Sequence, residues 1–227
     1  QSLSTNTEPA SGRVESDPIR AACLVCPQLY TVNVDSTYDA IASEYDYLTI
    51  PHWKDKFVFQ FIDELPGKRI LDVGCGTGRN AILFTSEGLE YTGIDFSHGM
   101  LSVAEHCSPE AASFARMNIC ELGFRSEAFD GFLSITSYMH LPKLRLPLAL
   151  LEAKRVLVPS GVGLISIPYG THEGMYAPIN EYGKILSNCW LTDKLLDVVT
   201  HIGFDILCVE EIGIHSSDMI VVIVKKK

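Results

Sequence analysis

RILDVGCGTGRN, residues 69–80, begins as an apolar strand, passes through three glycines and ends at the start of a helix. Gly74, Gly76 and Gly78 allow a sharp backbone turn, and they let a ligand approach amides that a Cβ atom would block. The N-terminus of the following helix adds positive potential. The stretch therefore predicts a strand–loop–helix unit whose loop cradles a cofactor.

A carboxylate stands at the end of the next predicted strand. Asp95 closes the apolar run YTGID, residues 91–95, at the carboxyl edge of that strand. A carboxylate at this place can accept hydrogen bonds from both hydroxyls of a ribose. A glycine loop alone is a weak signal, but the loop followed by an acid at the next strand end is more specific.

Strand-like apolar runs alternate with helical segments after residue 67, which is typical of a parallel sheet covered on both faces. The expected strands are 69–73, 91–94, 113–117, 131–136, 163–167, 205–212 and 219–224, and the helices between them are 80–87, 98–107, 148–157 and 192–201. Residues 213–218 are too few for a crossover, so the last two strands must form an antiparallel hairpin. The sequence predicts an α/β fold with a doubly wound, seven-stranded mixed sheet.

The part of the chain before the sheet divides into an arm and two helical segments. Residues 1–35 are rich in Ser, Thr, Asn and Pro and lack periodicity, which predicts an extended or partly ordered arm. Residues 38–48 and 53–65 each carry an apolar stripe with helical spacing. We expect one domain over 36–227, made of a helical cap at 36–66 and an α/β core at 67–227.

Four segments together resemble the class I S-adenosylmethionine-dependent methyltransferase family: DVGCGTG at 72–78, GID at 93–95, FDGFLSITSYMHL at 129–141 and RVLVPSGVGLISI at 155–167. The resemblance covers about residues 38–227. It implies a Rossmann-like fold, S-adenosylmethionine as cofactor and N-terminal helices that cap the cofactor site. A dinucleotide-dependent dehydrogenase fits less well, because the glycine pattern is G-x-G-x-G after Asp72 and the final hairpin is a methyltransferase feature.

The resemblance also implies how the first two strand ends hold the cofactor. Gly74, Gly76 and Gly78 would pass under its methionine part, Asp72 would support their loop, and Asp95 would hold the ribose.

The resemblance places three further residues at the adenine. Phe96 would lie against one face of the ring, although it is equally a candidate for an ordinary core aromatic. Asn118 stands where the family usually has an Asp that accepts a hydrogen bond from the adenine amino group, and an Asn carbonyl can accept the same bond. Ile119 would pack on the ring.

The fourth strand ends at residues 136–140, TSYMH, on the edge that faces the transferable methyl group in the family. Thr136 is expected to contact the cofactor. Methyl transfer from a sulfonium is an in-line displacement, so the protein must align the reactants and remove a proton from a hydroxyl or ammonium acceptor. His140 is the candidate general base, and the alternative is that it only braces the loop.

The acceptor pocket is expected at the same edge. Residues 168–181, PYGTHEGMYAPINE, form a polar and aromatic insertion in a region where loops carry specificity. Its candidates for substrate contact are Tyr169, His172, Glu173 and Tyr176, and the alternative is a solvated surface loop. Tyr38 and Tyr45 on the N-terminal helices are candidates for the opposite wall, or else for amphipathic packing.

The amino-acid composition limits the kinds of partner that the protein is expected to bind. The chain of 227 residues is 47% apolar and carries a net charge of −10, which suits a globular protein and disfavours nonspecific nucleic-acid binding. No apolar run is long enough for a membrane span, and the first twenty residues do not look like an uncleaved secretory signal. Seven scattered cysteines favour reduced thiols and a cytoplasmic location. Cys23 and Cys26 lack a second ligand pair, so no metal is expected.

These observations favour a methyltransferase that acts on a small-molecule O, N or S acceptor. A protein or peptide acceptor is a further alternative, as are a catalytically inactive S-adenosylmethionine-binding partner subunit and a protein that uses the sulfonium only electrostatically for another reaction. The sequence leaves open the identity of the acceptor and the oligomeric state.

Overall fold

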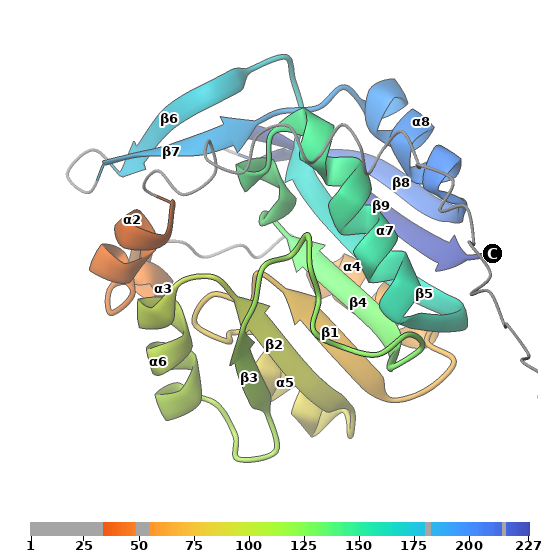
Figure 1. Cartoon of the computed structure of the whole chain (residues 1–227), viewed down its shortest axis with the longest axis horizontal. Helices are drawn as coiled ribbons and strands as arrows, with labels where there is room; N and C mark the ends of the chain where they lie inside the picture. Colours follow the sequence, from red (N-terminus) through yellow and green to blue (C-terminus); the bar gives the residue numbers. More distant parts are fainter. Residues whose placement is uncertain (1–33, 49–54, 180–182, 215–216) are drawn as a thin grey trace, which may run out of the picture.

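The computed structural model describes residues 34–48, 55–179, 183–214 and 217–227 (Figure 1). The predicted arm therefore lies outside the described residues except for its last two positions. No helix in these ranges is long and apolar enough to cross a membrane.

A seven-stranded mixed sheet forms the centre of the molecule. Its strand order is β3-β2-β1-β4-β5-β9-β8. Strands β1 to β5 pair in parallel, and β9 pairs antiparallel with both β5 and β8. The bounds are β1 Arg69–Val73, β2 Glu90–Asp95, β3 Ser113–Arg116, β4 Phe129–Ile135, β5 Leu157–Pro168, β8 Phe204–Ile214 and β9 Ser217–Lys226. The predicted sheet and its antiparallel final hairpin are confirmed.

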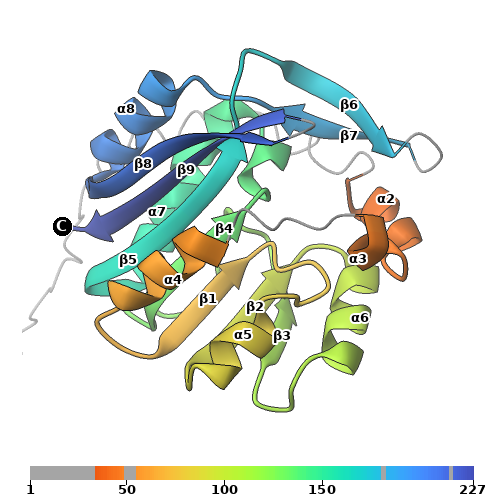
Figure 2. The same ribbon diagram turned by 180° about the vertical axis from the view of Figure 1, so that it is seen from behind.

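Helices cover both faces of the sheet, as the apolar strands require. α4 (Asp55–Asp63) and α5 (Ala81–Ser86) lie on one face, and α7 (Leu146–Val156) and α8 (Thr192–Ile202) lie on the other (Figures 1 and 2). α6 (His98–Cys107) packs beside β2 and β3. α8 ends at Gly203, whose φ of +92° suits a left-handed helix cap.

The sheet order creates the crevice in which a site is expected. β1 lies between β2 and β4, so the chain leaves β1 toward one edge of the sheet and later returns to add β4 on the other side. Ligands of open α/β sheets bind at such a switch point, outside the carboxyl ends of the strands. The loops that follow β1 and β4 therefore lie together at the predicted site.

The predicted loop at 168–181 is wrong in part, because half of it forms one strand of a β-hairpin. β6 (Glu173–Ile179) pairs antiparallel with β7 (Gly183–Asn188) as a separate two-stranded sheet. Asn188 anchors this hairpin: its amide nitrogen donates to the Leu141 carbonyl at 2.7 Å, and its side-chain oxygen accepts from the Gly174 amide at 3.1 Å. Contacts between distant residues hold the hairpin, and local alternation of apolar and polar residues does not reveal them.

The N-terminal helices also differ from the prediction. Residues 38–48 are not one helix: α2 (Val34–Ile41) and α3 (Tyr45–Leu48) are separated by a turn at 42–44. Both lie near the carboxyl edge of the sheet (Figure 1). α4 instead lies on a sheet face, because Phe57 and Phe61 complete the core there.

Candidate active site

The three predicted glycines all have left-handed backbone angles, with φ of +76° at Gly74, +56° at Gly76 and +74° at Gly78. A Cβ atom on Gly74 would lie 2.3 Å from the Cβ of Ser137, so this glycine lets the loop after β1 touch the loop after β4. A Cβ on Gly76 would meet only the Tyr45 ring, at 3.8 Å. Position 76 is therefore the least crowded of the three loop glycines.

Asp72 lies beneath the loop and is almost fully buried. Its Oδ2 accepts hydrogen bonds from the Asn80 side-chain amide and from the Tyr91 hydroxyl, both at 2.8 Å. Asn80 directly precedes α5, so Asp72 ties the start of the loop to its end. This geometry fits the expected supporting role. The roles of Asn80 and Tyr91 were not predicted from the sequence: Asn80 directly follows the glycine motif, whereas Tyr91 lies on β2, and only the pairing of β1 with β2 brings it to Asp72.

Asp95 joins the glycine loop to the end of β2. Its Oδ2 accepts from the Gly76 amide and its Oδ1 from the Ser97 amide, each at 2.9 Å. Burial raises the pKa of Asp95, and these amide donors oppose that rise. A carboxylate oxygen can accept more than one hydrogen bond, so both oxygens retain capacity for ribose hydroxyls.

Phe96 is not a core residue, because 42% of it is exposed. The Arg116 guanidinium lies 5.0 Å from the centre of the Phe96 ring, and Arg116 Nε donates to the Phe96 carbonyl at 2.8 Å. Asn118 is also exposed, and its side-chain oxygen accepts from the Cys120 amide at 2.9 Å. Ile119 is half-buried and packs against the core.

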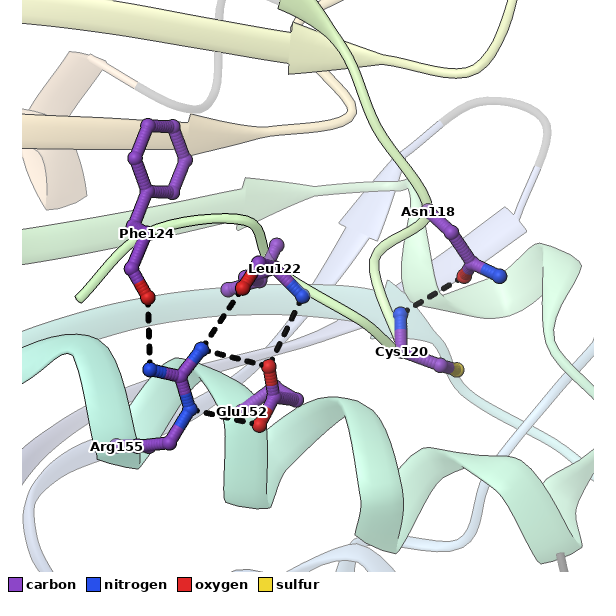
Figure 3. A network of polar contacts seen from close by, with 6 residues as sticks. All are labelled: Asn118, Cys120, Leu122, Phe124, Glu152 and Arg155. Carbon is purple, nitrogen blue, oxygen red and sulfur yellow. Dashed lines mark hydrogen bonds and ion pairs between the residues drawn. The ribbon is translucent and has the colours of Figure 1, made fainter. Parts of the chain in front are cut away.

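The segment that follows Asn118 is held by a pair of residues that the sequence analysis missed (Figure 3). Arg155 on α7 donates to the carbonyls of Phe124 at 2.7 Å and Leu122 at 2.8 Å. Glu152 forms an ion pair with Arg155 and accepts from the Leu122 amide at 2.9 Å. The spacing of the pair on a helix is visible in the sequence, but its partners on the irregular segment are not.

Thr136 has a φ of +59°, which is unusual and strained for a β-branched residue. Its hydroxyl donates to the Ile135 carbonyl at 2.7 Å, and its amide donates to the Ser166 carbonyl at 3.1 Å. The next residue, Ser137, donates to the Val73 carbonyl at 2.6 Å. The chain therefore turns sharply after β4, directly against the end of β1.

His140 lies in the short 3₁₀ helix η2 (Tyr138–His140) and is bonded through both ring nitrogens. Nδ1 is 2.6 Å from the Leu186 carbonyl oxygen, and Nε2 is 2.9 Å from the Tyr38 hydroxyl. Because a carbonyl only accepts, Nδ1 carries the hydrogen, and the neutral ring then accepts from Tyr38 at Nε2. Burial lowers the pKa of His140, although the Leu186 bond opposes this. The His140 ring, with its hydrogen on Nδ1, therefore joins α2, η2 and β7.

Tyr45 lies over the glycine loop. Its ring packs edge-on against Tyr38 and lies 4.8 Å from the Arg79 guanidinium. The neighbouring Asp46 accepts from the Thr77 hydroxyl and from Arg79 Nε, both at 2.6 Å. Of the predicted acceptor-wall residues, Tyr38 and Tyr45 are thus brought to the glycine loop and His140.

The other predicted acceptor residues lie around the hairpin. Tyr169 is exposed, and its amide donates to the Asp218 carbonyl at 2.8 Å. His172 is exposed, and the exposed Glu173 lies 3.5 Å from Lys143. The backbone of Tyr176 pairs with Ile185, whereas its side chain lies outside the described residues. Cys23 and Cys26 also lie outside the described residues, among which no group of three candidate metal ligands occurs.

Comparisons with known proteins match the part of the chain that contains the glycine loop. Residues 71–165 match the methyltransferase domain family. The chain is 33% identical over 142 residues to a probable tRNA methyltransferase 9B of Homo sapiens, covering 62% of this chain and 30% of that protein. It is 30% identical over 136 residues to a demethylmenaquinone methyltransferase of Renibacterium salmoninarum, covering 56% and 55%. These matches span from about a third to about half of the relatives' lengths.

The fold is also that of a solved S-adenosylmethionine-dependent methyltransferase from Mesorhizobium loti. The TM-score is 0.63 at 17% identity, and the match covers 76% of this chain and 97% of that one. The glycine loop, the strand order and these matches define a methyltransferase domain. Over residues 71–165 the chain matches the methyltransferase domain family, and its fold is that of solved S-adenosylmethionine-dependent methyltransferases.

Proposed function

We propose that this protein transfers a methyl group from S-adenosylmethionine to a small-molecule O, N or S acceptor. The observation that carries the proposal is the 2.9 Å hydrogen bond from the Gly76 amide to Asp95. It joins the glycine loop and the acid at the end of β2 into one cradle. When bound, the cofactor supplies a methyl group on a positively charged sulfur, which is open to in-line attack by a nucleophile.

The residues present fit this cofactor. Gly76 is the least crowded of the loop glycines, and Asp95 supplies two oxygens for the ribose. Phe96, Asn118 and Ile119 follow the ends of β2 and β3, where the adenine would lie. In the proposed arrangement, Gly74 and Gly78 shape the loop around the methionine part, Asp72 supports it, and Thr136 contacts the cofactor from the end of β4.

A small acceptor is favoured by how the opposite side of the site is built. The His140 ring contacts both the Tyr38 hydroxyl and the Leu186 carbonyl, so it joins three separate elements. The net charge of −10 disfavours a polyanionic acceptor such as tRNA. One relative is named for tRNA and another for demethylmenaquinone, and the net charge favours the second kind of acceptor.

His140 is proposed to act on the acceptor side, as a base or as a brace. It can serve as a base only after the Tyr38 hydroxyl leaves Nε2, because Nδ1 already donates to a carbonyl. With Tyr38 in place, His140 braces α2 against η2 and β7. Tyr169, His172, Glu173 and Tyr176 stay candidates for acceptor contact at the hairpin.

The engagement of both His140 nitrogens also favours a second candidate function, an inactive S-adenosylmethionine-binding subunit. A cytoplasmic location is proposed for either function. It is supported by the five cysteines of the described residues, all of which are free thiols.

Calorimetry and a transfer assay test these proposals. We expect S-adenosylmethionine and S-adenosylhomocysteine to bind and to raise the melting temperature, because a ligand of the folded state stabilises it. NAD should not bind. Incubation of tritiated S-adenosylmethionine with fractionated extracts should then label the small-molecule fraction. Binding without label in any fraction would favour the inactive subunit, label in RNA would overturn the small acceptor, and binding of NAD alone would overturn both candidates.

A further inference from the structure

The contact between α2 and the start of α6 is built around one carboxylate. Asp39 Oδ1 accepts from the Ser97 hydroxyl at 2.6 Å and from the Gly99 amide at 2.7 Å. A carboxylate is favoured at a helix N-terminus, where the amides point outward. Partial burial raises the pKa of Asp39, but the hydrogen bonds from Ser97 and Gly99, together with the electrostatic effects of Arg116 and His98, lower it overall. The carboxylate is thus ionised at neutral pH and holds the two helices together.

Gly99 completes the contact from the α6 side. A Cβ atom at this position would lie 2.8 Å from the Asp39 Cα and 3.0 Å from the Asp39 carbonyl oxygen. Both are backbone atoms, so no rotation of a side chain could relieve the contact. α2 can therefore lie this close to α6 only because residue 99 is a glycine.

Ser97 connects this contact to the proposed ribose site. Its amide donates to Asp95 at 2.9 Å, while its hydroxyl donates to Asp39 at 2.6 Å. The same hydroxyl accepts from the Met100 amide at 3.0 Å. Ser97 therefore links Asp95, the acid on the cofactor side, to α2.

Tyr38 directly precedes Asp39 and faces the other side of the site. Its ring packs with Ile41, Ala42 and Met100, and its hydroxyl lies 2.9 Å from His140 Nε2. α2 is only eight residues long, so a displacement at Asp39 must also move the hydroxyl of Tyr38.

We propose that Asp39 is a positioning residue for the acceptor side of the site, which holds the Tyr38 hydroxyl on His140 by docking α2 against the N-terminus of α6. Its carboxylate binds Ser97 and Gly99, so it acts through Tyr38 and does not take part in the methyl transfer itself. The inference rests on the proposed function, because only that function makes this side of the site the acceptor side. The docking of α2 against α6 can be tested without any acceptor.

The test is ¹⁵N NMR of the His140 ring in the full chain, with His140→Gln to assign its signals. In the parent we expect the Nδ1-protonated neutral form and a pKa below the ordinary 6.5, because the ring is buried. Asp39→Ala should let water reach the ring and shift its pKa toward 6.5. Gly99→Ala should have the same effect. Asp39→Asn should resemble the parent, because the amide oxygen can accept both hydrogen bonds.

Asp63→Ala is the matched control, because Asp63 is an exposed acid on α4. It should leave the His140 signals unchanged. If Asp39→Ala fails to fold, Ser97→Ala, which removes one of the two donors, should give a smaller shift in the same direction. Unchanged His140 signals in every folded variant at Asp39, Ser97 and Gly99 would overturn the proposal.

Calorimetry with S-adenosylhomocysteine separates this proposal from the proposed function. Asp39→Ala should still bind this probe. If His140 is a brace, the transfer rate of the variant with an acceptor should fall by about a hundredfold, because release of Tyr38 misplaces the acceptor side. Failure of the parent to bind the probe would count against the proposed function, and the NMR result would still decide the docking of α2. A parent-like transfer rate in Asp39→Ala would overturn the positioning role.

Discussion

The Tyr38 hydroxyl lies 2.9 Å from His140 Nε2, although the two residues are 102 positions apart in the chain. The bond joins the first described helix to the loop after β4, across the edge where methyl transfer is proposed. Because Nδ1 of the same ring faces the Leu186 carbonyl, the bond also determines which nitrogen can accept a proton. Any acid–base role of His140 therefore depends on the position of Tyr38.

His140→Ala tests whether His140 is a general base or only a structural brace. If His140 is the base, the variant should keep its cofactor affinity and lose transfer rate by about a hundredfold to ten-thousandfold. Burial lowers the folded-state pKa of His140 below 6.5, so the ring stays neutral until the pH falls below that value. The parent's rate should thus decline on the acid side of pH 6.5, and the variant should lack this decline.

Tyr38→Phe is the companion variant for this pH profile, because it frees Nε2 and keeps the aromatic ring. If cofactor affinity and rate fall together in His140→Ala while the acid decline persists, His140 is a brace. The base must then be sought among Tyr169, His172 and Glu173.

Gly74→Ala should destabilise the protein more than Gly88→Ala. The two glycines have nearly equal φ angles, +76° and +74°, so each alanine carries a similar backbone strain of about 1–2 kcal/mol. Only the Cβ at position 74 meets another atom, 2.3 Å from Ser137 Cβ, whereas position 88 is open. Urea unfolding should show an excess loss of about 1–3 kcal/mol for Gly74→Ala. Equal losses would mean that the loops after β1 and β4 can move apart freely.

Asp95→Ala should weaken cofactor binding by more than the loss of ribose contacts. The variant also leaves the Gly76 and Ser97 amides without their acceptor, so the glycine loop loses its tie to β2. Each charge-assisted hydrogen bond contributes about 1.5–3 kcal/mol, so calorimetry should show at least a tenfold weaker affinity for S-adenosylmethionine. A folded variant that binds as tightly as the parent would disprove the ribose role.

Arg155→Lys should loosen the segment behind the proposed adenine wall. Lysine cannot reproduce the fork that binds the carbonyls of Leu122 and Phe124 together with Glu152, so we expect a loss of about 1–3 kcal/mol in stability. The affinity for S-adenosylhomocysteine should fall as well. Arg125→Lys, an exposed change in the same region, is the control and should alter neither. Lower stability with parent-like affinity would show that this segment does not shape the adenine side.

Much of the fold follows from local patterns that the sequence makes visible. The run from residue 69 to residue 80 predicted a strand, a loop and a helix start, because glycines with left-handed angles interrupt an apolar strand there. The short connection at 213–218 predicted an antiparallel hairpin, because no crossover fits in six residues. Both features depend on neighbours in the chain, and the structure confirms the hairpin of β8 and β9.

Other features depend on contacts between distant residues. The β6–β7 hairpin reads as a polar loop in the sequence, and Asn188 anchors it to the Leu141 carbonyl through a contact that no periodic pattern encodes. Phe96 is a second example. In the sequence, an aromatic residue next to a strand resembles a core residue, but Phe96 is 42% exposed and lies beside Arg116.

The sequence by itself determined the chemistry available at the edge of the sheet: a glycine loop, an acid at the next strand end, and a histidine after the fourth strand. Only the tertiary structure decided how these groups are used. It placed the Gly76 amide on Asp95, Asp39 on the start of α6, and Tyr38 on His140. The physical reason is that hydrogen bonds and burial depend on which elements meet in space, and the packing of α2 against α6 and β7 sets the protonation and reach of His140.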